Sequence, residues 1–316
     1  MPLRISVVVP TLDTRTLTAA CVDAVFASRL PAGTGLEVVV VDDGSRDGTG
    51  EAFAGRAGVR VVRNDAPTGF SRAVNRGAAE TTGDLLVLLN SDTEAEPGSL
   101  ARVVEAFETD PALGVAGAVL RFPDGTPQWS GGREPDLLWL CAQASAFPAL
   151  LGHLPGWRRI KPLHPAAPAD MDWVSGAAMA IRTSVWREAG PFETVYGFYG
   201  QDLELCRRAR DGGWRVRILP GFRVLHHQGA TISTTGEKAS GNADLGLLWS
   251  DLVRWAERRR GMAYARRARR AIRAGSLLRL AARQVALPFV AASHRSEWRR
   301  ETAILSAARA VLETRP

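Results

Sequence analysis

The sequence predicts an α/β protein with a mostly parallel sheet flanked by helices, followed by a C-terminal helical extension rich in arginine. Three observations support this fold class. Short apolar runs of five or six residues alternate with segments of helical spacing through the first 120 residues, a pattern typical of parallel strands joined by helices. Two of these runs end directly in clusters of polar residues. After residue 253, arginine and small apolar residues dominate the composition.

The expected strands and helices alternate in chain order. The first apolar run is β-branched and is stopped by Pro10, which fits a short buried strand followed by a loop. The run at 85–89 is apolar throughout, which favours a strand buried on both faces. The predicted strands are 5–9, 36–41, 59–63, 85–89 and 115–120. The predicted helices are 18–28, 51–57 and 97–110, with a further helix entered from the polar loop at 64–77.

The region from 122 to 169 departs from this alternation. It is rich in Pro, Gly and Trp and shows little periodicity, and a long irregular insertion in a compact domain is more often a lid or binding loop than a simple connection. Order returns at 173–182, in a helix ending at Gly190, in a helix entered at Gln201, and in strands at 214–219 and 223–225. We therefore expect a first domain over 1–235 and an Arg-rich helical extension over 236–316.

Size and charge bound the class of protein. The chain has 316 residues, 46% of them hydrophobic, which is enough for a large domain with an appendage and excludes a disordered chain. From Arg254 onward there are 16 arginines and four glutamates, a local net charge of +12. Because the whole chain carries +7, the first 253 residues carry −5. The basic character therefore belongs to the extension.

Cysteine usage and apolar stretches bear on location. The three cysteines, Cys21, Cys141 and Cys206, are widely spaced, which favours a reducing compartment over a disulfide framework or a metal motif. The N-terminal apolar run is too short for a signal peptide, and Arg279 and Arg283 interrupt the best candidate for a membrane span. We expect a cytoplasmic protein, with peripheral association at the inner face of the cell membrane as an option.

Carboxylates stand where two of the predicted strands end. Asp42 and Asp43 follow the strand at 36–41, and the triplet Asn-Ser-Asp at 90–92 follows the strand at 85–89. In open parallel sheets ligands bind beyond the carboxyl ends of the strands. A carboxylate held there can bind a metal or a phosphate, or can accept hydrogen bonds from a nucleotide base or ribose. A turn after a core strand is the simpler alternative for each site.

Spacing removes three other interpretations of these motifs. A calcium loop starting at Asp43 has Ala54 where a bidentate glutamate is required. The segment 48–53 lacks the third glycine of a dinucleotide-binding fingerprint, and no phosphate-binding Gly-Lys-Ser/Thr loop occurs.

Taken together, the ordered motifs resemble those of the family 2 glycosyltransferases and, within them, the bacterial rhamnosyltransferase-like branch. The resemblance covers about the first 235 residues. It rests on these segments: Val9-Pro-Thr11, Val41-Asp-Asp-Gly-Ser45, Asn64 through Gly69-Phe70 to Asn75-Arg-Gly77, Leu88-Leu-Asn-Ser-Asp92, Gly176-Ala177, Gly190-Pro-Phe-Glu193, Gln201-Asp-Leu-Glu-Leu-Cys206 and His226-His-Gln-Gly229. Several ordered motifs are together more specific than any one of them.

This resemblance implies a GT-A fold and a nucleotide-sugar site. Asp43 would bind the base of the donor, and Asp92 with His226 would hold the Mg²⁺ or Mn²⁺ that bridges its diphosphate. The family pattern Asp-x-Asp is changed here to Asn90-Ser-Asp92, so an amide oxygen replaces one carboxylate. The nucleotide-sugar contacts are expected at Pro10, Thr11, Asp42, Asp43, Asn64, Gly69, Arg72, Asn75, Asn90 and Ser91.

Catalysis and acceptor binding are assigned in the same way. Asp202 matches the general base that takes the proton of the acceptor hydroxyl, while a helix N-cap is its alternative role. The usual glutamate before it is Gln201 here. Acceptor contacts are expected from Trp173, Gly176 and Gln201. Aromatic faces in the 122–169 insertion, among them Trp129, Trp139 and Trp157, can stack on sugars unless they pack in the core.

The extension joins paired arginines to apolar residues such as Leu277, Leu280, Leu287 and Phe289. That composition suits helices lying on an anionic bilayer, which would bring the enzyme to a lipid-linked acceptor. A solvated helical bundle is the alternative. Nucleic acid is not expected as a partner, because no reading motif accompanies the charge.

The sequence thus predicts an inverting, metal-dependent glycosyltransferase of cell-envelope polysaccharide synthesis. Family likeness favours dTDP-rhamnose as donor, although the residues do not exclude a UDP-sugar. The alternative is a non-catalytic nucleotide- or carbohydrate-binding protein on the same fold, which Asn90 and Gln201 make conceivable. A nucleotidyltransferase would need a Gly-rich basic loop after its first strand, and the sequence has none there.

Overall fold

The chain divides into two compact units, seen here in a computed structural model that describes residues 3–145, 165–197, 199–227 and 244–314. The sheet unit comprises residues 1–133, 161–195 and 201–241. The helical unit comprises residues 134–160, 196–200 and 242–316. The expected domain boundary between 235 and 236 lies outside the described residues, as does Trp157.

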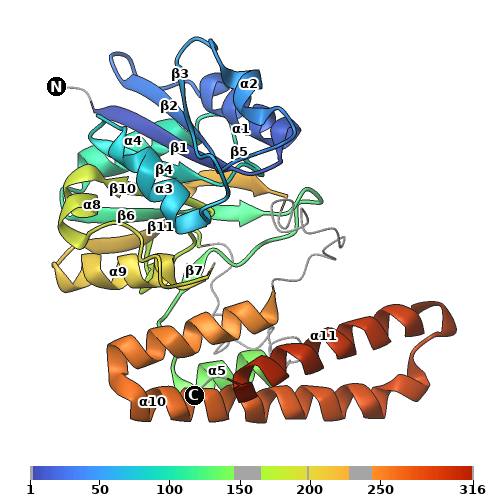
Figure 1. Ribbon diagram of the computed structural model, residues 1–316. Coiled ribbons are helices and arrows are strands. Elements are labelled where there is room, and N and C mark those ends of the chain that lie inside the picture. The colour runs from blue at the N-terminus through green and yellow to red at the C-terminus, as the bar shows by residue number, and fades with distance from the viewer. Residues whose placement is uncertain (1–2, 146–164, 198, 228–243, 315–316) are drawn as a thin grey trace. The chain divides into compact units, whose positions relative to one another are not determined.

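Strands and helices alternate along the sheet unit (Figure 1). Its strands are β1 (Arg4–Thr11), β2 (Gly35–Asp42), β3 (Val59–Arg63), β4 (Leu85–Leu89), β5 (Thr93–Ala95), β6 (Leu113–Arg121), β7 (Gly131–Gly132), β8 (Ala169–Asp170), β9 (Trp173–Val174), β10 (Ala178–Arg182) and β11 (Arg215–His226). Its helices are α1 (Arg15–Ala27), α2 (Thr49–Phe53), α3 (Phe70–Ala79), α4 (Ser99–Thr109), α8 (Thr183–Ala189) and α9 (Gln201–Asp211).

The main sheet has the strand order β3-β2-β1-β4-β10-β6-β11-β5, with β8 paired to β11. Strands β3, β2, β1 and β4 run parallel to one another, and β6 runs parallel to β11. Strand β10 runs antiparallel to both β4 and β6, and β5 runs antiparallel to β11. The described strands β7 and β9 form a separate small sheet. These pairings confirm the predicted mostly parallel sheet.

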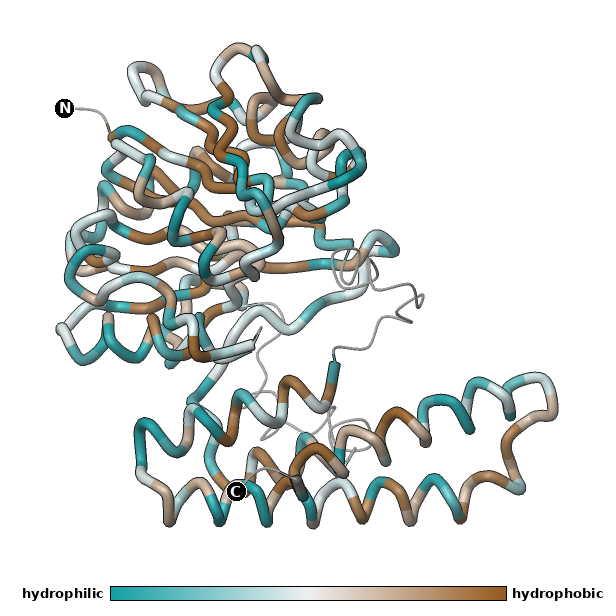
Figure 2. Tube along the Cα trace, in the orientation of Figure 1, coloured by the Kyte–Doolittle hydropathy of each residue, from teal (hydrophilic) through white to brown (hydrophobic). Residues whose placement is uncertain are grey.

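Helices cover both faces of the sheet. Side chains of α1 and α4 pack in one apolar cluster, and side chains of α3, α8 and α9 pack in a second cluster on the other face. In Figure 2 the strands between these layers are mostly brown, the colour of apolar residues. All five residues of β4 are buried, because β1 and β10 flank the strand and both faces are covered. Strand β4 therefore matches the prediction for 85–89.

Strand β11 is longer than the sequence predicts. Two strands were expected at 214–219 and 223–225, but the structure has one strand from Arg215 to His226. Its pairing with β6 shifts register between Ile218 and Arg223, where Pro220 lacks an N–H for the ladder and the strand bulges without ending. As a result His226 ends a continuous core strand rather than a loop.

Buried thiols belong to the two apolar clusters. Cys21 packs in the cluster of α1 and Cys206 in the cluster of α9. Burial raises the pKa of each thiol to about 12, so neither is a thiolate near neutral pH. Both cysteines therefore serve as small apolar residues.

The helical unit is built from α5 (Leu137–Ser145), α10 (Leu245–Ala286) and α11 (Arg295–Thr314), with short 3₁₀ turns at Leu287–Phe289 and Ala292–His294. Gly261 has φ of 79° and breaks α10 into two helical segments (Figure 1). Helices α10 and α5 pack closely at Gly275, which has no side chain. A Cβ added there would lie 2.1 Å from the carbonyl oxygen of Cys141 and would clash with it. Apolar side chains buried in this unit include Trp249, Trp255, Ala268, Ile272, Leu305 and Leu312.

The helical unit also contains the segment that precedes α9. Asp251 of α10 is fully buried, and its carboxylate accepts hydrogen bonds from the N–H groups of Gly197 and Tyr199, each at 3.0 Å. Arg254 pairs with the same carboxylate at 3.0 Å. A buried carboxylate needs such partners, so these contacts fix the segment Tyr196–Gly200 to α10.

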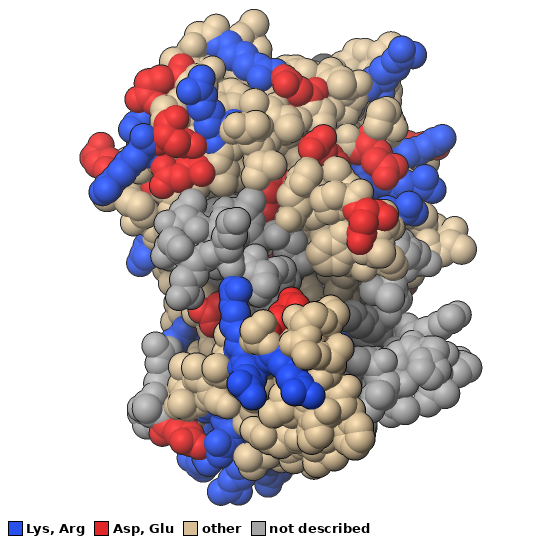
Figure 3. Space-filling view, turned by 90° about the vertical axis from the view of Figure 1, so that its right-hand side faces the viewer, with Lys and Arg blue, Asp and Glu red and all other residues tan. Residues whose placement is uncertain are grey.

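The surface of the helical unit is basic and partly apolar. Figure 3 shows several groups of basic side chains on its visible face. Phe289 is 87% exposed and Val285 is 73% exposed at the turn between α10 and α11. Nearby, Arg283 lies over the ring of Trp298, 3.9 Å from its centroid. Within the described ranges, no helix is both long enough and apolar enough to span a bilayer.

Candidate functional site

Several of the sequence-predicted site residues lie at one edge of the main sheet. The parallel strands β1, β2 and β4 all end there, at Thr11, Asp42 and Leu89. Strand β10 begins at the same edge, because it runs antiparallel and Ala178 pairs with Leu89. Strand β11 ends there too, and His226 pairs with Thr93 of β5. The edge therefore gathers side chains that lie up to 215 residues apart in the sequence.

Asp92 is a buried carboxylate at the end of β4. Its side chain is almost fully buried, and its Oδ1 atom lies 3.4 Å from Nε2 of His226. Neither Oδ1 of Asp92 nor Oδ1 of Asn90 has a hydrogen-bond partner. Such orphaned buried oxygens are uncommon in folded proteins. Two oxygen atoms and one imidazole nitrogen are thus available to a ligand at the end of β4.

The separation of Asp92 and His226 fits two ligands of one small cation. Bonds of about 2.1 Å meeting at angles of roughly 90–110° place two ligand atoms about 3.0–3.4 Å apart. Among the described residues there is no group of three or more His, Cys, Asp or Glu that could hold a metal. A cation at this position would therefore draw its remaining ligands from Asn90, from a bound diphosphate and from water.

The two adjacent histidines have different partners. His226 is 8% exposed and faces Asp92. His227 instead places Nε2 2.8 Å from Oε1 of Glu94, and its N–H donates to the carbonyl oxygen of Asp92. Of the two histidines, only His226 therefore points its ring towards the carboxylate of Asp92. The sequence alone could not distinguish between them.

Gln128 is a site residue that sequence reasoning missed. It is 5% exposed, and its amide meets His226 at two points. The turn that returns Gln128 to the end of β6 has a sequence signal, Pro123-Asp-Gly-Thr126, which favours a tight reversal. In the structure Oδ1 of Asp124 accepts from the N–H of Thr126, and Gly125 has φ of 81°.

The loop after β1 is locked to the loop after β4 by hydroxyl groups. Oγ1 of Thr11 lies 2.9 Å from that of Thr14 and 2.7 Å from that of Thr18. Thr14 in turn donates to Oγ of Ser91 at 2.9 Å. Pro10, the last residue before Thr11, is buried in β1. Of the expected donor contacts, Thr11 and Ser91 are thus part of one buried network.

Asp42 holds the loop after β2. Its Oδ1 accepts from the N–H of Ser45 at 2.8 Å, and its Oδ2 lies 3.2 Å from Nη1 of Arg63. The turn needs glycine at position 44, where φ is 87° and an added Cβ would lie 2.9 Å from the backbone of Ala66. The loops after β2 and β3 therefore pass in direct contact.

The carboxylate of Asp43 accepts hydrogen bonds from several groups of the loop after β3. Its two oxygens accept from the N–H and the hydroxyl of Thr68, from the N–H of Gly69 and from Nδ2 of Asn64, at 2.6–3.0 Å. A carboxylate offers about four lone-pair sites. In this structure Asp43 therefore anchors the segment that enters α3, and a base that donates to Asp43 must displace one of these bonds.

The two remaining donor-side residues lie on α3. Arg72 is exposed on this helix. Asn75 exchanges two hydrogen bonds with the backbone of Phe192: it donates to the carbonyl oxygen at 2.8 Å and accepts from the N–H at 2.9 Å. Asn75 thus ties α3 to the segment between α8 and α9. Its amide is occupied, whereas Arg72 extends from the helix surface.

Asp202 stands at the first turn of α9. Its Oδ2 accepts from the N–H of Gly176 at 3.1 Å, and its Oδ1 accepts from the N–H of Leu203 at 2.8 Å. Gly176 precedes Ala177, whose carbonyl oxygen accepts from the N–H of Asn90. This chain of contacts connects Asp202 to the end of β4. Gln201, the first residue of α9, is buried beside it.

Trp173 lies on β9 with Trp129 against it. The two rings are edge to face, with centroids 5.1 Å apart. The indole N–H of Trp173 donates to the carbonyl oxygen of Arg133, and that of Trp129 donates to the carbonyl oxygen of Gly131. Trp139 is instead buried in α5 of the helical unit. The two paired tryptophans are thus fixed in place and half-buried.

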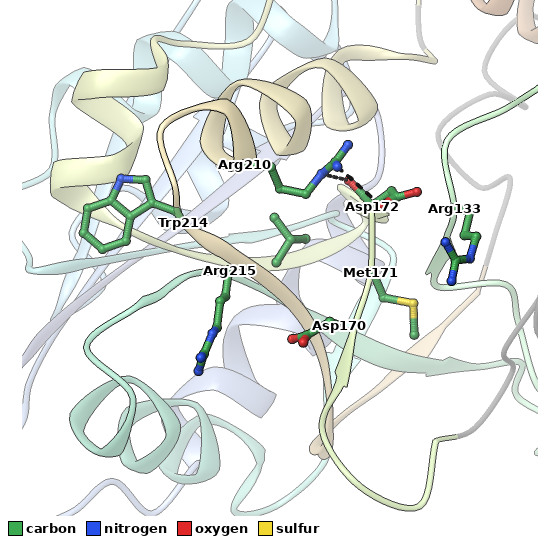
Figure 4. A pocket seen from close by; sticks show the side chains of 8 residues that line it. Arg133, Asp170, Met171, Asp172, Arg210, Trp214 and Arg215 are labelled. Atoms are coloured by element: carbon green, nitrogen blue, oxygen red, sulfur yellow. Dashed lines mark hydrogen bonds and ion pairs between the residues drawn. The ribbon is translucent and has the colours of Figure 1, made fainter.

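A cavity of about 360 Å³ lies away from this edge, at the beginning of β11. Figure 4 shows Arg210 and Asp172, joined by an ion pair, beside Trp214 and Arg215. Because Arg215 starts β11 and His226 ends it, the cavity and the strand-end cluster are separated by about 30 Å of strand. The cavity is therefore not part of the cluster around Asp92.

Both the sequence and the fold are similar to those of known glycosyltransferases. The family described as "Glycosyl transferase family 2" matches residues 6–168, just over half of the chain. The N-acetylglucosaminyl-diphospho-decaprenol L-rhamnosyltransferase of Mycobacterium tuberculosis is 30% identical over 213 residues, which are 61% of this chain and 67% of that protein.

Solved structures with the same fold include a mannosyltransferase of Pyrobaculum calidifontis in complex with GDP-Man and Mn²⁺. It matches with a TM-score of 0.62 and 18% identity, over 99% of this chain and 86% of that one. GalNAc-T7, solved with UDP, GalNAc and Mn²⁺, matches with a TM-score of 0.58 and 18% identity, over 81% of this chain and 48% of that one. The predicted GT-A fold is confirmed. The chain belongs to glycosyl transferase family 2, in its rhamnosyltransferase-like branch.

Proposed function

We propose that this glycosyltransferase is metal-dependent and moves a sugar, with inversion, from a nucleotide-sugar to a glycan or lipid-linked acceptor of the cell envelope. The observation that carries the proposal is the pair of Asp92 and His226, 3.4 Å apart, with an orphaned carboxylate oxygen between strand ends. The family sets the reaction class, and this pair fits the binding of a divalent cation with a diphosphate. The cation would be Mg²⁺ or Mn²⁺, held by Asp92 and His226 with Asn90 beside them.

The donor is proposed to be dTDP-rhamnose. The mycobacterial relative is named an L-rhamnosyltransferase, and its name includes a lipid diphosphate carrying N-acetylglucosamine. In our proposal the base lies near Asp42 and Asp43, where the segment Asn64–Thr68 closes the edge. Thr11, Ser91 and Gly69 would border the diphosphate, and Arg72 would reach it from α3. The saturated carboxylate of Asp43 implies that this segment shifts when the base binds.

Asp202 is proposed to act as the general base. Its carboxylate takes the proton of the acceptor hydroxyl as that oxygen forms a bond to the anomeric carbon. The bond from that carbon to the diphosphate breaks, and the nucleoside diphosphate leaves with the electron pair. Attack opposite the leaving group inverts the configuration. A bound divalent cation would offset the charge that develops on the diphosphate.

The acceptor is proposed to approach beside α9. Gly176 has no side chain and lies against Asp202, which leaves room for a hydroxyl close to the carboxylate. Gln201 directly precedes Asp202 on α9, and Trp173 on β9 lies three residues before Gly176. The paired rings of Trp129 and Trp173 offer an apolar face to a sugar. A lipid-linked glycan would extend from there.

A donor screen by thermal shift tests this function. We expect dTDP-rhamnose with Mn²⁺ to raise the Tm by about 5 °C at 100 times its Kd, since ligand binding at that ratio adds about 2.7 kcal/mol. With EDTA the shift is expected to be smaller, because the diphosphate loses its bridging cation. Free rhamnose is the control and should leave the Tm unchanged. If none of a panel of nucleotide-sugars shifts the Tm, the proposed function is wrong.

The helical unit is proposed to lie on the inner, anionic face of the cell membrane. Phe289 and Val285 are exposed at the turn between α10 and α11, and exposed arginines on α11 flank the turn, among them Arg295 and Arg299. Apolar side chains that enter the acyl boundary next to cations paired with lipid headgroups are typical of interfacial helices. Such contact would hold the enzyme near a lipid-linked acceptor.

Replacing Phe289 by serine should weaken this association. Burial of a phenylalanine contributes about 1.5–3 kcal/mol, so we expect the partition coefficient of Phe289→Ser on anionic vesicles at low salt to be lower than that of wild type by roughly 10–100-fold. Phe26→Ser, a half-exposed phenylalanine of α1, is the matched control and should be retained like wild type. Equal retention of all three proteins, or no retention of wild type, would refute membrane association through this turn.

A further inference from the structure

Gln128 is bound to His226 at both ends of its side-chain amide. Nε2 of Gln128 lies 2.6 Å from the carbonyl oxygen of His226, and Oε1 lies 2.8 Å from Nδ1 of the imidazole. Gln128 is 5% exposed. Its own backbone N–H donates to the carbonyl oxygen of Leu120, so the residue is paired to the end of β6. The amide thus has a fixed position and fixed partners.

The chemistry of these partners determines the orientation of the amide. A backbone carbonyl oxygen only accepts hydrogen bonds, so the group 2.6 Å from it must be the NH₂ end of Gln128. Oε1 then faces Nδ1 of His226. Because an amide oxygen also only accepts, Nδ1 must carry a proton. The contact with the carbonyl oxygen alone fixes this orientation, since reversal of the amide would place two acceptor oxygens 2.6 Å apart.

The other imidazole nitrogen faces Asp92. In a neutral ring with Nδ1 protonated, Nε2 holds a lone pair. Nε2 is 3.4 Å from Oδ1 of Asp92, and that oxygen accepts no hydrogen bond. Two electron-pair donors therefore point into the same space, which is the arrangement that a cation requires. Metal-binding histidines commonly donate their second N–H to a neighbouring acceptor in this way.

We infer that Gln128 is a positioning residue, which fixes His226 with Nδ1 protonated and with Nε2 open towards Asp92. The inference rests on the proposed function, since it concerns the residues that would hold the divalent cation. The position of Gln128 follows from the turn at Phe122–Thr126, which folds the chain back along the end of β6. The role requires both a donor and an acceptor, so glutamine suits this position and leucine does not.

Nitrogen-15 NMR of the full-length protein without metal tests the inference directly. In wild type at neutral or higher pH, we expect the neutral His226 ring to be almost entirely the form with Nδ1 protonated. The signal is assigned by its loss in His226→Gln. In Gln128→Leu, which removes both hydrogen bonds, we expect a mixture of the two ring forms. Wild type with Nε2 protonated, or Gln128→Leu with the wild-type spectrum, would overturn the inference.

Mn²⁺ titration, followed by electron paramagnetic resonance in the presence of dTDP, supplies a second measurement. We expect Gln128→Leu to bind Mn²⁺ about 10–100-fold more weakly than wild type. Gln284→Leu, an exposed glutamine of α10, is the matched control and should bind like wild type. Circular dichroism and Tm establish that each variant is folded. Equal affinity of wild type and Gln128→Leu would contradict a role in cation binding.

The two measurements separate this inference from the proposed function. If wild type binds no Mn²⁺, the metal-dependent function fails, and the NMR experiment still decides whether Gln128 sets the form of the His226 ring. If the ring form changes in Gln128→Leu but Mn²⁺ affinity does not, Gln128 orients His226 without any effect on cation binding. That result would refute the inference that Gln128 positions His226 for a cation.

Discussion

Asp202→Asn should abolish most sugar transfer while leaving donor binding intact. A positioned general base contributes about 10²–10⁴-fold to a rate, and asparagine keeps the shape of aspartate but cannot take a proton. We therefore expect kcat to fall by that factor. The Kd of the donor should change little, because Asp202 lies on α9 against Gly176, away from the loops after β2 and β3. Steady-state kinetics and donor titration measure the two quantities.

The matched control for this variant lies on the same helix. Asp211 ends α9, is 47% exposed and pairs with Arg207 one turn earlier. Asp211→Asn also removes one carboxylate from α9, so it tests whether lost charge or altered helix stability explains an effect. We expect wild-type kcat for Asp211→Asn. Equal activity of Asp202→Asn and wild type would mean that Asp202 serves only to hold the first turn of α9, through its hydrogen bonds with Gly176 and Leu203.

Asp92→Ala should have the second large effect, on cation binding. Loss of a residue that only supports a ligand costs about 10–100-fold in metal affinity. Removal of a direct ligand is expected to cost more, beyond ~100-fold for Mn²⁺ in the presence of dTDP. Transfer at limiting Mn²⁺ should fall in parallel, and excess Mn²⁺ should restore part of it. Mn²⁺ titration and rate measurements over a range of Mn²⁺ concentrations provide the test.

Glu94 supplies the control for Asp92. It is a carboxylate two residues further along, and it bonds to His227 rather than to His226. Glu94→Ala removes the same charge from nearly the same place but should leave Mn²⁺ affinity within a few-fold of wild type. If Glu94→Ala and Asp92→Ala weaken Mn²⁺ binding equally, the effect is one of general charge, and the proposed ligand set is wrong.

Much of the sheet unit follows from local sequence. Strand β4 was predicted with its exact bounds because five apolar residues between polar flanks allow few alternatives. The direction of β10 was not predictable, since the apolar run at 178–181 has the same pattern in either direction. Strand β11 was predicted as two strands, because Pro220 and Gly221 are strong local turn signals. In the structure the residues before Pro220 and those after Gly221 both pair with β6, so the strand continues through this dipeptide.

Some residues of the candidate site could be predicted from the sequence, and others could not. Asp42, Asp43 and Asp92 could be found because each follows a recognisable strand, and Asp202 because a family motif surrounds it. Gln128 could not be found from such patterns, because its partner His226 lies 98 residues away and only the fold brings them together. The Pro-Asp-Gly turn before Gln128 predicted a reversal of the chain, but not which strand end the chain would meet. The saturation of Asp43 likewise depends on a loop 25 residues further on.

Mass spectrometry of the reaction product tests directly whether the protein transfers a sugar. Wild-type protein is incubated with dTDP-rhamnose, Mn²⁺ and a lipid-diphosphate N-acetylglucosamine acceptor, and then with a panel of other nucleotide-sugars. We expect the acceptor to gain the mass of one sugar as an equal amount of nucleoside diphosphate is released, and we expect both changes to be at least about 100-fold smaller in Asp202→Asn and with EDTA. A folded wild-type protein that binds a nucleotide-sugar but yields no product with any donor would contradict it, and would identify a binding protein on a glycosyltransferase fold.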